Sequence, residues 1–157
     1  MANAPLEIGV KAPDFRLPRD GGDHVALSDY AGQPVVLFFY PKASTPGCTT
    51  EAIDFTRLLP DFEKAGAAVI GISKDSVKRQ ENFSAKQELG VPLLSDAEDE
   101  VCEAYGVWGE KKMYGKTFLG ITRTTYLIGA DGKIAHVWSK VKVPGHAEEV
   151  LEAARAL

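Results

Sequence analysis

Cys48 lies in the segment of this sequence that is best suited to activating a side chain for chemistry. Residues 35–40 are apolar or aromatic, which predicts a strand buried on both faces, and Pro41 ends it. Thr45 is a favourable helix N-cap, and Pro46 is a favourable first helical residue. Cys48 then falls in the first helical turn, where unpaired N–H groups and the helix dipole stabilise an anion. Because the thiolate is the reactive form of cysteine, the segment predicts a nucleophile.

Composition limits the classes of protein to which the chain can belong. Its 157 residues predict a single domain over residues 1–157 with an ordinary core. The 18 basic and 22 acidic residues give a formal charge of −4, so we expect neither nucleic acid nor a membrane as partner. The sequence has no run of about 18 apolar residues, so we expect no membrane span. The first residues do not resemble a secretory signal. The two cysteines are typical of a reducing compartment, and we expect a cytoplasmic protein.

The elements around Cys48 alternate between strands and helices. A Pro-punctuated strand over residues 9–18 and a return strand over 24–27 predict an N-terminal β-hairpin. The helix that contains Cys48 continues to Ala65-Gly66, and Pro60 inside it should kink or split it. A second buried strand follows over residues 67–73.

The second half of the chain continues this alternation. Asp75 or Ser76 caps a polar helix that should end at Gly90. The whole order predicts an α/β fold in which a central mixed sheet is flanked by helices, with its ligand site at the carboxyl ends of the strands. The remaining predicted elements are a strand over 91–94, a short helix over 99–105, an irregular insertion over 109–120, a hairpin of strands 123–129 and 133–140 with a turn at Asp131-Gly132, and a helix over 145–157.

Three stretches resemble the peroxiredoxins, and among them the bacterioferritin-comigratory-protein or Q-type subfamily. The resemblance covers nearly the whole chain in colinear order. It implies a thioredoxin-like fold and the reduction of hydrogen peroxide and organic hydroperoxides without a metal or organic cofactor. The stretches are Gly9-x-x-Ala12-Pro13-x-Phe15-x-Leu17, the active-site pattern Pro41-x-x-x-Thr45-x-x-Cys48 with Thr49-Thr50-Glu51 after it, and residues 106–111 with 120–123.

The resemblance also implies roles for individual residues. Cys48 would be the peroxidatic cysteine, which attacks the peroxide and becomes a sulfenic acid. Thr45 would hydrogen-bond the peroxide, and Pro41 would shield the thiolate from water. Arg123 would favour the thiolate and polarise the peroxide, in accordance with the charge that develops in such a reaction. Glu51 is either a first-turn acid that the helix dipole favours or a residue that contacts Arg123 from behind the site.

One position departs from the subfamily pattern. A resolving cysteine is expected either five residues after the peroxidatic one, where this chain has Ile53, or in an Asn-Phe-Cys-Ala-Lys context, where it has Ser84. Either the chain is a natural one-cysteine enzyme, or Ser84 is a substitution that removes the resolving thiol, and its intact context favours the second explanation. We expect that the variant Ser84→Cys could not form a bridge to Cys48 unless both helices rearranged.

The resemblance further implies a thioredoxin-type reductant and a monomer. Cys102, on an apolar helix face, is interpreted as a buried thiol without a resolving role. A thiol–disulfide oxidoreductase is a rival hypothesis, but it would need Cys-x-x-Cys, and Glu51 occupies the second position. A redox sensor that uses Cys48 is the other rival. The three histidines are scattered singly, so no zinc site is expected.

Overall fold

A five-stranded mixed sheet forms the centre of the molecule. The computed structural model describes residues 5–157, so the first four residues of the predicted domain lie outside the described residues. The strand order is β5-β4-β3-β8-β9, in which β3 is parallel to β4 and antiparallel to β8. The predicted α/β fold with a central mixed sheet is therefore confirmed. The strands are β3 (Val35–Phe39), β4 (Ala68–Ser73), β5 (Leu93–Ser95), β8 (Thr124–Ile128) and β9 (Ile134–Ser139).

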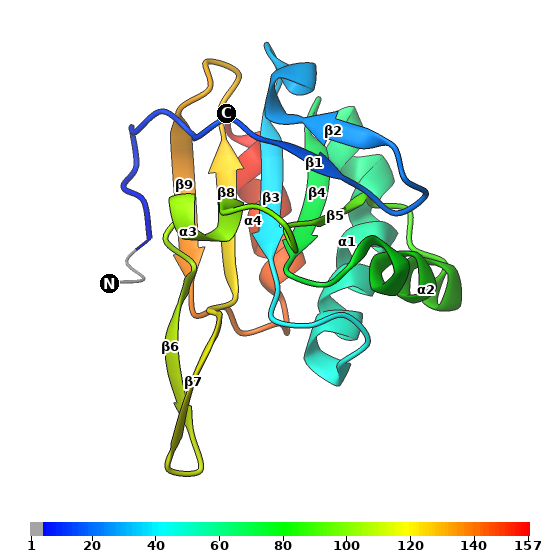
Figure 1. Ribbon diagram of the computed structural model, residues 1–157. Helices are drawn as coiled ribbons and strands as arrows, with labels where there is room; N and C mark the ends of the chain where they lie inside the picture. The colour runs from blue at the N-terminus through cyan, green and yellow to red at the C-terminus, as the bar shows by residue number, and fades with distance from the viewer. Residues whose placement is uncertain (1–4) are drawn as a thin grey trace.

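Helices cover both faces of this sheet, as Figure 1 shows. The long helix α1 (Pro46–Lys64) packs beside α4 (His146–Arg155) on one face, and α2 (Val77–Gln87) adds Phe83 to the same core cluster. The short helix α3 (Val101–Ala104) and the N-terminal segment cover the other face. The predicted N-terminal hairpin is present. It consists of β1 (Arg16–Pro18) and β2 (His24–Ala26), followed by the 3-10 turn η1 (Leu27–Tyr30).

Strand β3 is buried on both faces, as its apolar sequence predicts. Val36 and Phe38 belong to the cluster with α1 and α4, whereas Leu37 and Phe39 belong to the cluster with α3. Phe38 stacks on Phe55 of α1 with ring centroids 4.7 Å apart, a contact worth about 0.5–1.5 kcal/mol beyond the buried area. The end of β3 is thus held rigidly at the point where the chain enters the Cys48 segment.

Residues 109–120 form a regular hairpin, so the prediction of an irregular insertion was wrong. Strands β6 (Trp108–Met113) and β7 (Lys116–Ile121) pair antiparallel and project from the body of the molecule (Figure 1). Tyr114 and Gly115 between them have φ values of 54° and 76°, so this pair supplies the two positive φ angles that a tight hairpin turn needs. Most side chains of the hairpin are exposed, so the sequence lacks the alternation that burial on one face would produce.

The extents predicted for two helices need correction, and of the two alternatives for Pro60 the split is excluded. Helix α1 runs unsplit through Pro60. Pro60 is exposed, so water can replace the hydrogen bond that its ring removes. Helix α2 is capped by Ser76, whose hydroxyl accepts from the N–H of Arg79, but it ends at Glu88 in the left-handed conformation and not at Gly90. Helix α3 is a single turn, shorter than the predicted 99–105.

Candidate active site

The loop between β3 and α1 places Cys48 in the first turn of α1. Thr45 is the N-cap residue and Pro46 the first helical residue, as the sequence predicts. The Thr45 hydroxyl does not cap the helix, however, but donates to the carbonyl oxygen of Lys42 at 2.7 Å. Ser44 has a φ of 67°, a conformation that tightens this loop at some energetic cost. Cys48 itself is only 1% exposed, so the sulfur lies at the bottom of the site.

A buried hydrogen-bond network holds the loop from behind. One carboxylate oxygen of Asp75 accepts from the Ala43 N–H and from the Ser73 hydroxyl, both at 2.7 Å. The Gln80 amide donates to the Ser73 hydroxyl, and its oxygen accepts from the Tyr40 hydroxyl at 2.5 Å. Buried polar groups satisfied in this way fix a single arrangement. These supports were not found from the sequence, because their partners lie 32 and 40 residues apart.

Arg123 reaches the site from the residue before β8. Its Nη2 lies 3.3 Å from Cys48 Sγ, and its Nη1 donates to Glu51 Oε1 at 2.7 Å. Burial alone would lower the pKa of Arg123, but the acidic groups Glu51 and Cys48 raise it above its ordinary value. A Cβ atom on Gly47 would lie 3.1 Å from Nη2, so this close approach of the guanidinium depends on glycine there. The structure thus brings together two groups separated by 75 residues in the sequence.

Glu51 is the acidic partner in this cluster. It is 1% exposed and lies one helical turn after Cys48 on the same helix. Burial raises its pKa to about 7, although the charge of Arg123 opposes the shift. Among the described residues, its Oε2 has no hydrogen-bond partner. The sequence left two interpretations of Glu51 open, a first-turn acid or a contact of Arg123. The structure shows the contact with Arg123.

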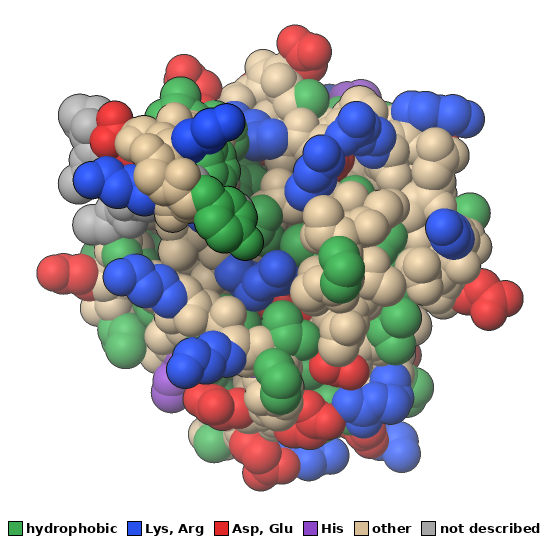
Figure 2. Space-filling view, turned by 90° about the horizontal axis from the view of Figure 1, so that it is seen from below, with side chains coloured by type: hydrophobic (Ala, Val, Ile, Leu, Met, Phe, Trp, Pro, Cys, Tyr) green, Lys and Arg blue, Asp and Glu red, His purple; other side chains and the backbone are tan. Residues whose placement is uncertain are grey.

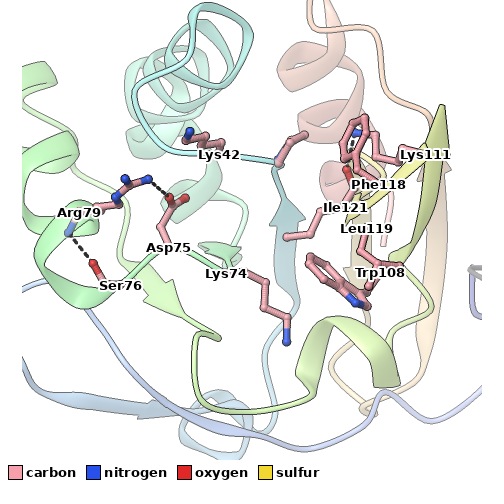
Figure 3. Close-up of a pocket in the computed structure, with 12 residues that line it drawn as sticks. Lys42, Lys74, Asp75, Ser76, Arg79, Trp108, Lys111, Phe118, Leu119 and Ile121 are labelled. Atoms are coloured by element: carbon pink, nitrogen blue, oxygen red, sulfur yellow. Dashed lines mark hydrogen bonds and ion pairs between the residues drawn. The ribbon is translucent and has the colours of Figure 1, made fainter. Parts of the chain in front are cut away.

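A cleft of about 580 Å³ opens beside the loop. The hairpin supplies Trp108, Phe118 and Leu119 to one wall, and the start of α2 supplies Arg79 to the opposite wall (Figure 3). Pro41 also lines the cleft, which connects the cleft to the Cys48 loop. Figure 2 views the end of the molecule toward which β3 runs, where the surface is hollowed among hydrophobic side chains and Lys and Arg side chains.

Lys111 closes the cleft on the side of the hairpin. Its ammonium donates to the carbonyl oxygen of Ile121 at 2.9 Å. Burial and the nearby charge of Arg123 lower the pKa of Lys111, while Cys48 acts in the opposite direction. The cleft is therefore largely apolar on the side of the hairpin, whereas charged side chains, among them Asp75 and Arg79, line the opposite side.

Comparisons with known proteins show which proteins this chain is similar to. The model of the AhpC/TSA family matches residues 8–137. Peroxiredoxin Bcp of Xanthomonas campestris is 49% identical over 156 residues, which cover 99% of this chain and 98% of that protein. Peroxiredoxin Bcp of Escherichia coli is 47% identical over 147 residues, which cover 94% of each. A solved structure of the X. campestris bacterioferritin comigratory protein, described as a trapped intermediate/ligand complex, has a TM-score of 0.89 at 48% identity and covers 96% of this chain and 98% of that one.

The chain belongs to the AhpC/TSA family, and within it to the Bcp/PrxQ peroxiredoxins.

Members of this group are thiol peroxidases, so the predicted thioredoxin-like fold and peroxidase activity are both confirmed. The comparisons do not assign roles to the individual residues. No group of three or more metal-ligating side chains occurs within residues 5–157. Over the same residues, no helix combines the length and the apolar character that crossing a membrane requires.

Three other positions of this peroxiredoxin concern a second thiol: the two at which the subfamily has a resolving cysteine, and Cys102. None of them contributes a contact to the Cys48–Arg123 pair. Ser84 is partly buried in α2, and Ile53 is 41% exposed on α1. Cys102 is completely buried on α3. Burial and the carboxylate of Asp96 raise the pKa of the Cys102 thiol far above its ordinary value, which keeps it protonated and unreactive.

Proposed function

We propose that Cys48 is the peroxidatic cysteine of this peroxiredoxin. Its thiolate attacks the oxygen of the hydroperoxide that carries hydrogen, the O–O bond breaks, and Cys48 becomes a sulfenic acid. The other oxygen leaves as an alkoxide or hydroxide and takes up one proton. The contact of 3.3 Å between Arg123 Nη2 and Cys48 Sγ carries this proposal, because a fixed cation at this point stabilises both the thiolate and the charge that develops on the leaving oxygen.

Thr45 and Pro41 complete the peroxide site in this proposal. Because the Thr45 hydroxyl already donates its hydrogen to Lys42, the lone pairs of its oxygen are free to accept a hydrogen bond from the O–H of the peroxide. Pro41 is half-buried between the Cys48 loop and the cleft, where its ring keeps water from the thiolate. Alignment of this kind accounts for a large part of the rate in reactions between two positioned groups.

The cleft provides a place for the organic part of an alkyl hydroperoxide. Its apolar walls of Trp108, Phe118, Leu119 and Ile121 would bury an alkyl chain favourably. The X. campestris relative is described in terms of alkyl peroxide reduction activity. We extend that substrate class to this chain, and propose that the same cysteine also reduces hydrogen peroxide, which has no alkyl group to occupy the cleft.

Ser84 occupies what we propose to be the resolving position. Cys102 is buried and its pKa is raised, so it does not replace a resolving thiol. Two solved structures of the X. campestris peroxiredoxin Q are cysteine-to-serine variants at different positions, which supports a two-cysteine cycle in that relative. In this chain the sulfenic acid would persist until an external thiol reduces it, either a thioredoxin-type protein or another donor. We further propose that the enzyme works as a cytoplasmic monomer.

Intact mass measured after one equivalent of peroxide tests the central proposal. The chain should gain one oxygen atom at Cys48, and Cys48→Ser should gain none, while Cys102→Ser serves as the matched control and should gain one. For Ser84→Cys we expect a loss of two hydrogens instead, as a disulfide forms. Peroxidase activity in Cys48→Ser, or oxygen bound at Cys102, would contradict the assignment.

A further inference from the structure

Cys48 and Glu51 share one cation. Arg123 Nη2 contacts the sulfur at 3.3 Å, and Nη1 contacts Glu51 Oε1 at 2.7 Å. Both acidic groups are 1% exposed. When Cys48 is a thiolate and Glu51 a carboxylate, two buried negative charges face one partly buried positive charge. One of the two acids is therefore better accommodated with its proton in place, since an uncompensated buried charge is costly.

The second oxygen of Glu51 is available to hold that proton. Oε2 is buried and, among residues 5–157, has no hydrogen-bond partner. A buried carboxylate whose second oxygen accepts nothing lacks half of the hydrogen bonds that normally stabilise the charged form. A protonated Oε2 removes this charge, while Oε1 still accepts from Arg123.

Within residues 5–157, no other charged or titratable group around the cluster places a second cation in contact with Glu51. Asp54 on α1 adds negative charge near Glu51 and raises its pKa further. His146 on α4 is buried, which lowers its pKa to about 4 and leaves it neutral near pH 7. Burial raises the pKa of Tyr40, which therefore stays neutral. Lys111 on β6 is cationic and near Cys48, but its ammonium is bound to the Ile121 carbonyl.

We propose that Glu51 carries a proton while Cys48 is a thiolate and gives it up when Cys48 becomes a sulfenic acid, so that one negative charge stays beside Arg123 throughout the reaction. This inference rests on the proposed role of Cys48 as the peroxidatic cysteine. It makes Glu51 a positioning residue that also balances the charge, although it does not touch the peroxide.

The proposed step balances in atoms and charge. Without Glu51, the thiolate and the hydroperoxide give a sulfenic acid and an alkoxide, and the alkoxide takes one proton from water. With Glu51, the thiolate, the carboxylic acid and the hydroperoxide give a sulfenic acid, a carboxylate and an alcohol. The proton lost by Glu51 offsets the proton taken up by the leaving oxygen, directly or through solvent, so net uptake from the buffer falls.

Infrared difference spectra of the reduced and peroxide-treated protein test the step directly. In the wild type, oxidation of Cys48 should remove the C=O stretch of a protonated carboxyl group and add carboxylate bands. Glu51→Gln should lack this change, and the matched variant Asp54→Asn on the same helix should retain it. Intact mass on the same samples establishes that Cys48 is oxidised. An oxidised wild type whose carboxyl bands do not change would overturn the inference.

Proton uptake measured with a pH indicator gives a second, independent test. Protons taken up per sulfenic acid should be fewer in the wild type than in Glu51→Gln, after each is corrected for its thiolate fraction by ultraviolet absorbance. The difference should be largest near pH 7, where Glu51 titrates, and amounts to about half a proton if oxidation shifts that titration by one pKa unit. Equal uptake at every pH would overturn the inference. If Cys48 gains no oxygen, the proposed function fails, which is a separate outcome.

Discussion

The two cysteines of this chain are equally inaccessible but have opposite electrostatic surroundings. Cys48 is 1% exposed and Cys102 is 0% exposed, so exposure does not distinguish them. Cys48 faces the guanidinium of Arg123 at the start of a 19-residue helix. Cys102 lies in a single-turn helix, where the carboxylate of Asp96 accepts its backbone N–H at 2.8 Å. The sign of the nearest charge, rather than access to water, distinguishes the thiol that we propose to react from the one that we propose to be inert.

Removal of the cation beside Cys48 should have the largest effect. Arg123→Met keeps an unbranched apolar stem but removes both the charge and the donors, so the rate of sulfenic acid formation with hydrogen peroxide should fall by about 10²–10³-fold. Stopped-flow kinetics measures it. Lys64→Met, which removes an exposed cation from the last turn of the same helix α1, is the matched control and should leave the rate unchanged. A rate within a few-fold of the wild type in Arg123→Met would show that the cation beside Cys48 does not determine the reactivity of its thiol.

A change of pH should reveal the cost of the buried acid beside that cation. The pKa of Glu51 rises from 4.5 to about 7 in the folded protein because of burial. Between these values the unfolded chain has lost a proton that the folded protein still holds, so the free energy of unfolding falls as the pH rises, by roughly 3 kcal/mol in total.

Denaturant unfolding at about pH 5 and at about pH 8 measures this loss of stability. The variant Glu51→Gln has no proton to lose at this position, so its stability should depend less on pH. If the wild type and the variant lost stability in parallel over this range, Glu51 would not be the group that titrates.

Displacement of the cation by a few tenths of an ångström should have a smaller effect. Gly47→Ala places a Cβ 3.1 Å from Arg123 Nη2, which forces the guanidinium to shift, so we expect about a tenfold loss of rate. Gly90→Ala is the matched control, because its Cβ would meet only flexible side chains at 3.4 Å or more. An unaffected rate in Gly47→Ala would show that the site tolerates a looser contact than the structure indicates.

The smallest kinetic effect is expected at the second thiol. Cys102→Ala removes a buried sulfur, so it should cost about 1–2 kcal/mol of unfolding free energy while the peroxide rate stays unchanged. Alkylation followed by peptide mass mapping should modify Cys48 in the native protein, and Cys102 only after unfolding. Modification of native Cys102 at a comparable rate would contradict the electrostatic distinction.

Local signals in the sequence were sufficient for the centre of the fold and for the start of α1. Six apolar residues in succession predict β3, and Thr45 with Pro46 predicts the helix start correctly to the residue. The β6–β7 hairpin was missed because most of its side chains are exposed, so hydrophobic periodicity carries no signal there. The turn at Tyr114 and Gly115 also lacks the usual Asn-Gly or Asp-Gly signature.

The site depends on contacts that no local pattern encodes. Arg123 lies 72 and 75 residues from its two partners, and only the family resemblance pointed to it. The support from Asp75 and Gln80 was not anticipated at all, because a polar side chain near a helix start is ordinarily a cap or a solvated group. Sequence reasoning found the groups that would react, while the structure added those that hold them in place.

The hydrogen bonds that Asp75 and Gln80 make behind the Cys48 loop would affect the order of steps in a two-cysteine reaction cycle. Gln80, from the same helix as Ser84, binds the hydroxyl of Tyr40 at the end of β3, and Asp75 just before that helix binds the Ala43 N–H. If a cysteine stood at position 84, movement of α2 toward Cys48 would break these hydrogen bonds and release the loop that we propose to align the peroxide. A chain with that cysteine would therefore need two different arrangements of the same few side chains. One would bind the peroxide, and the other would allow the disulfide to form, so the two steps could not occur at the same time.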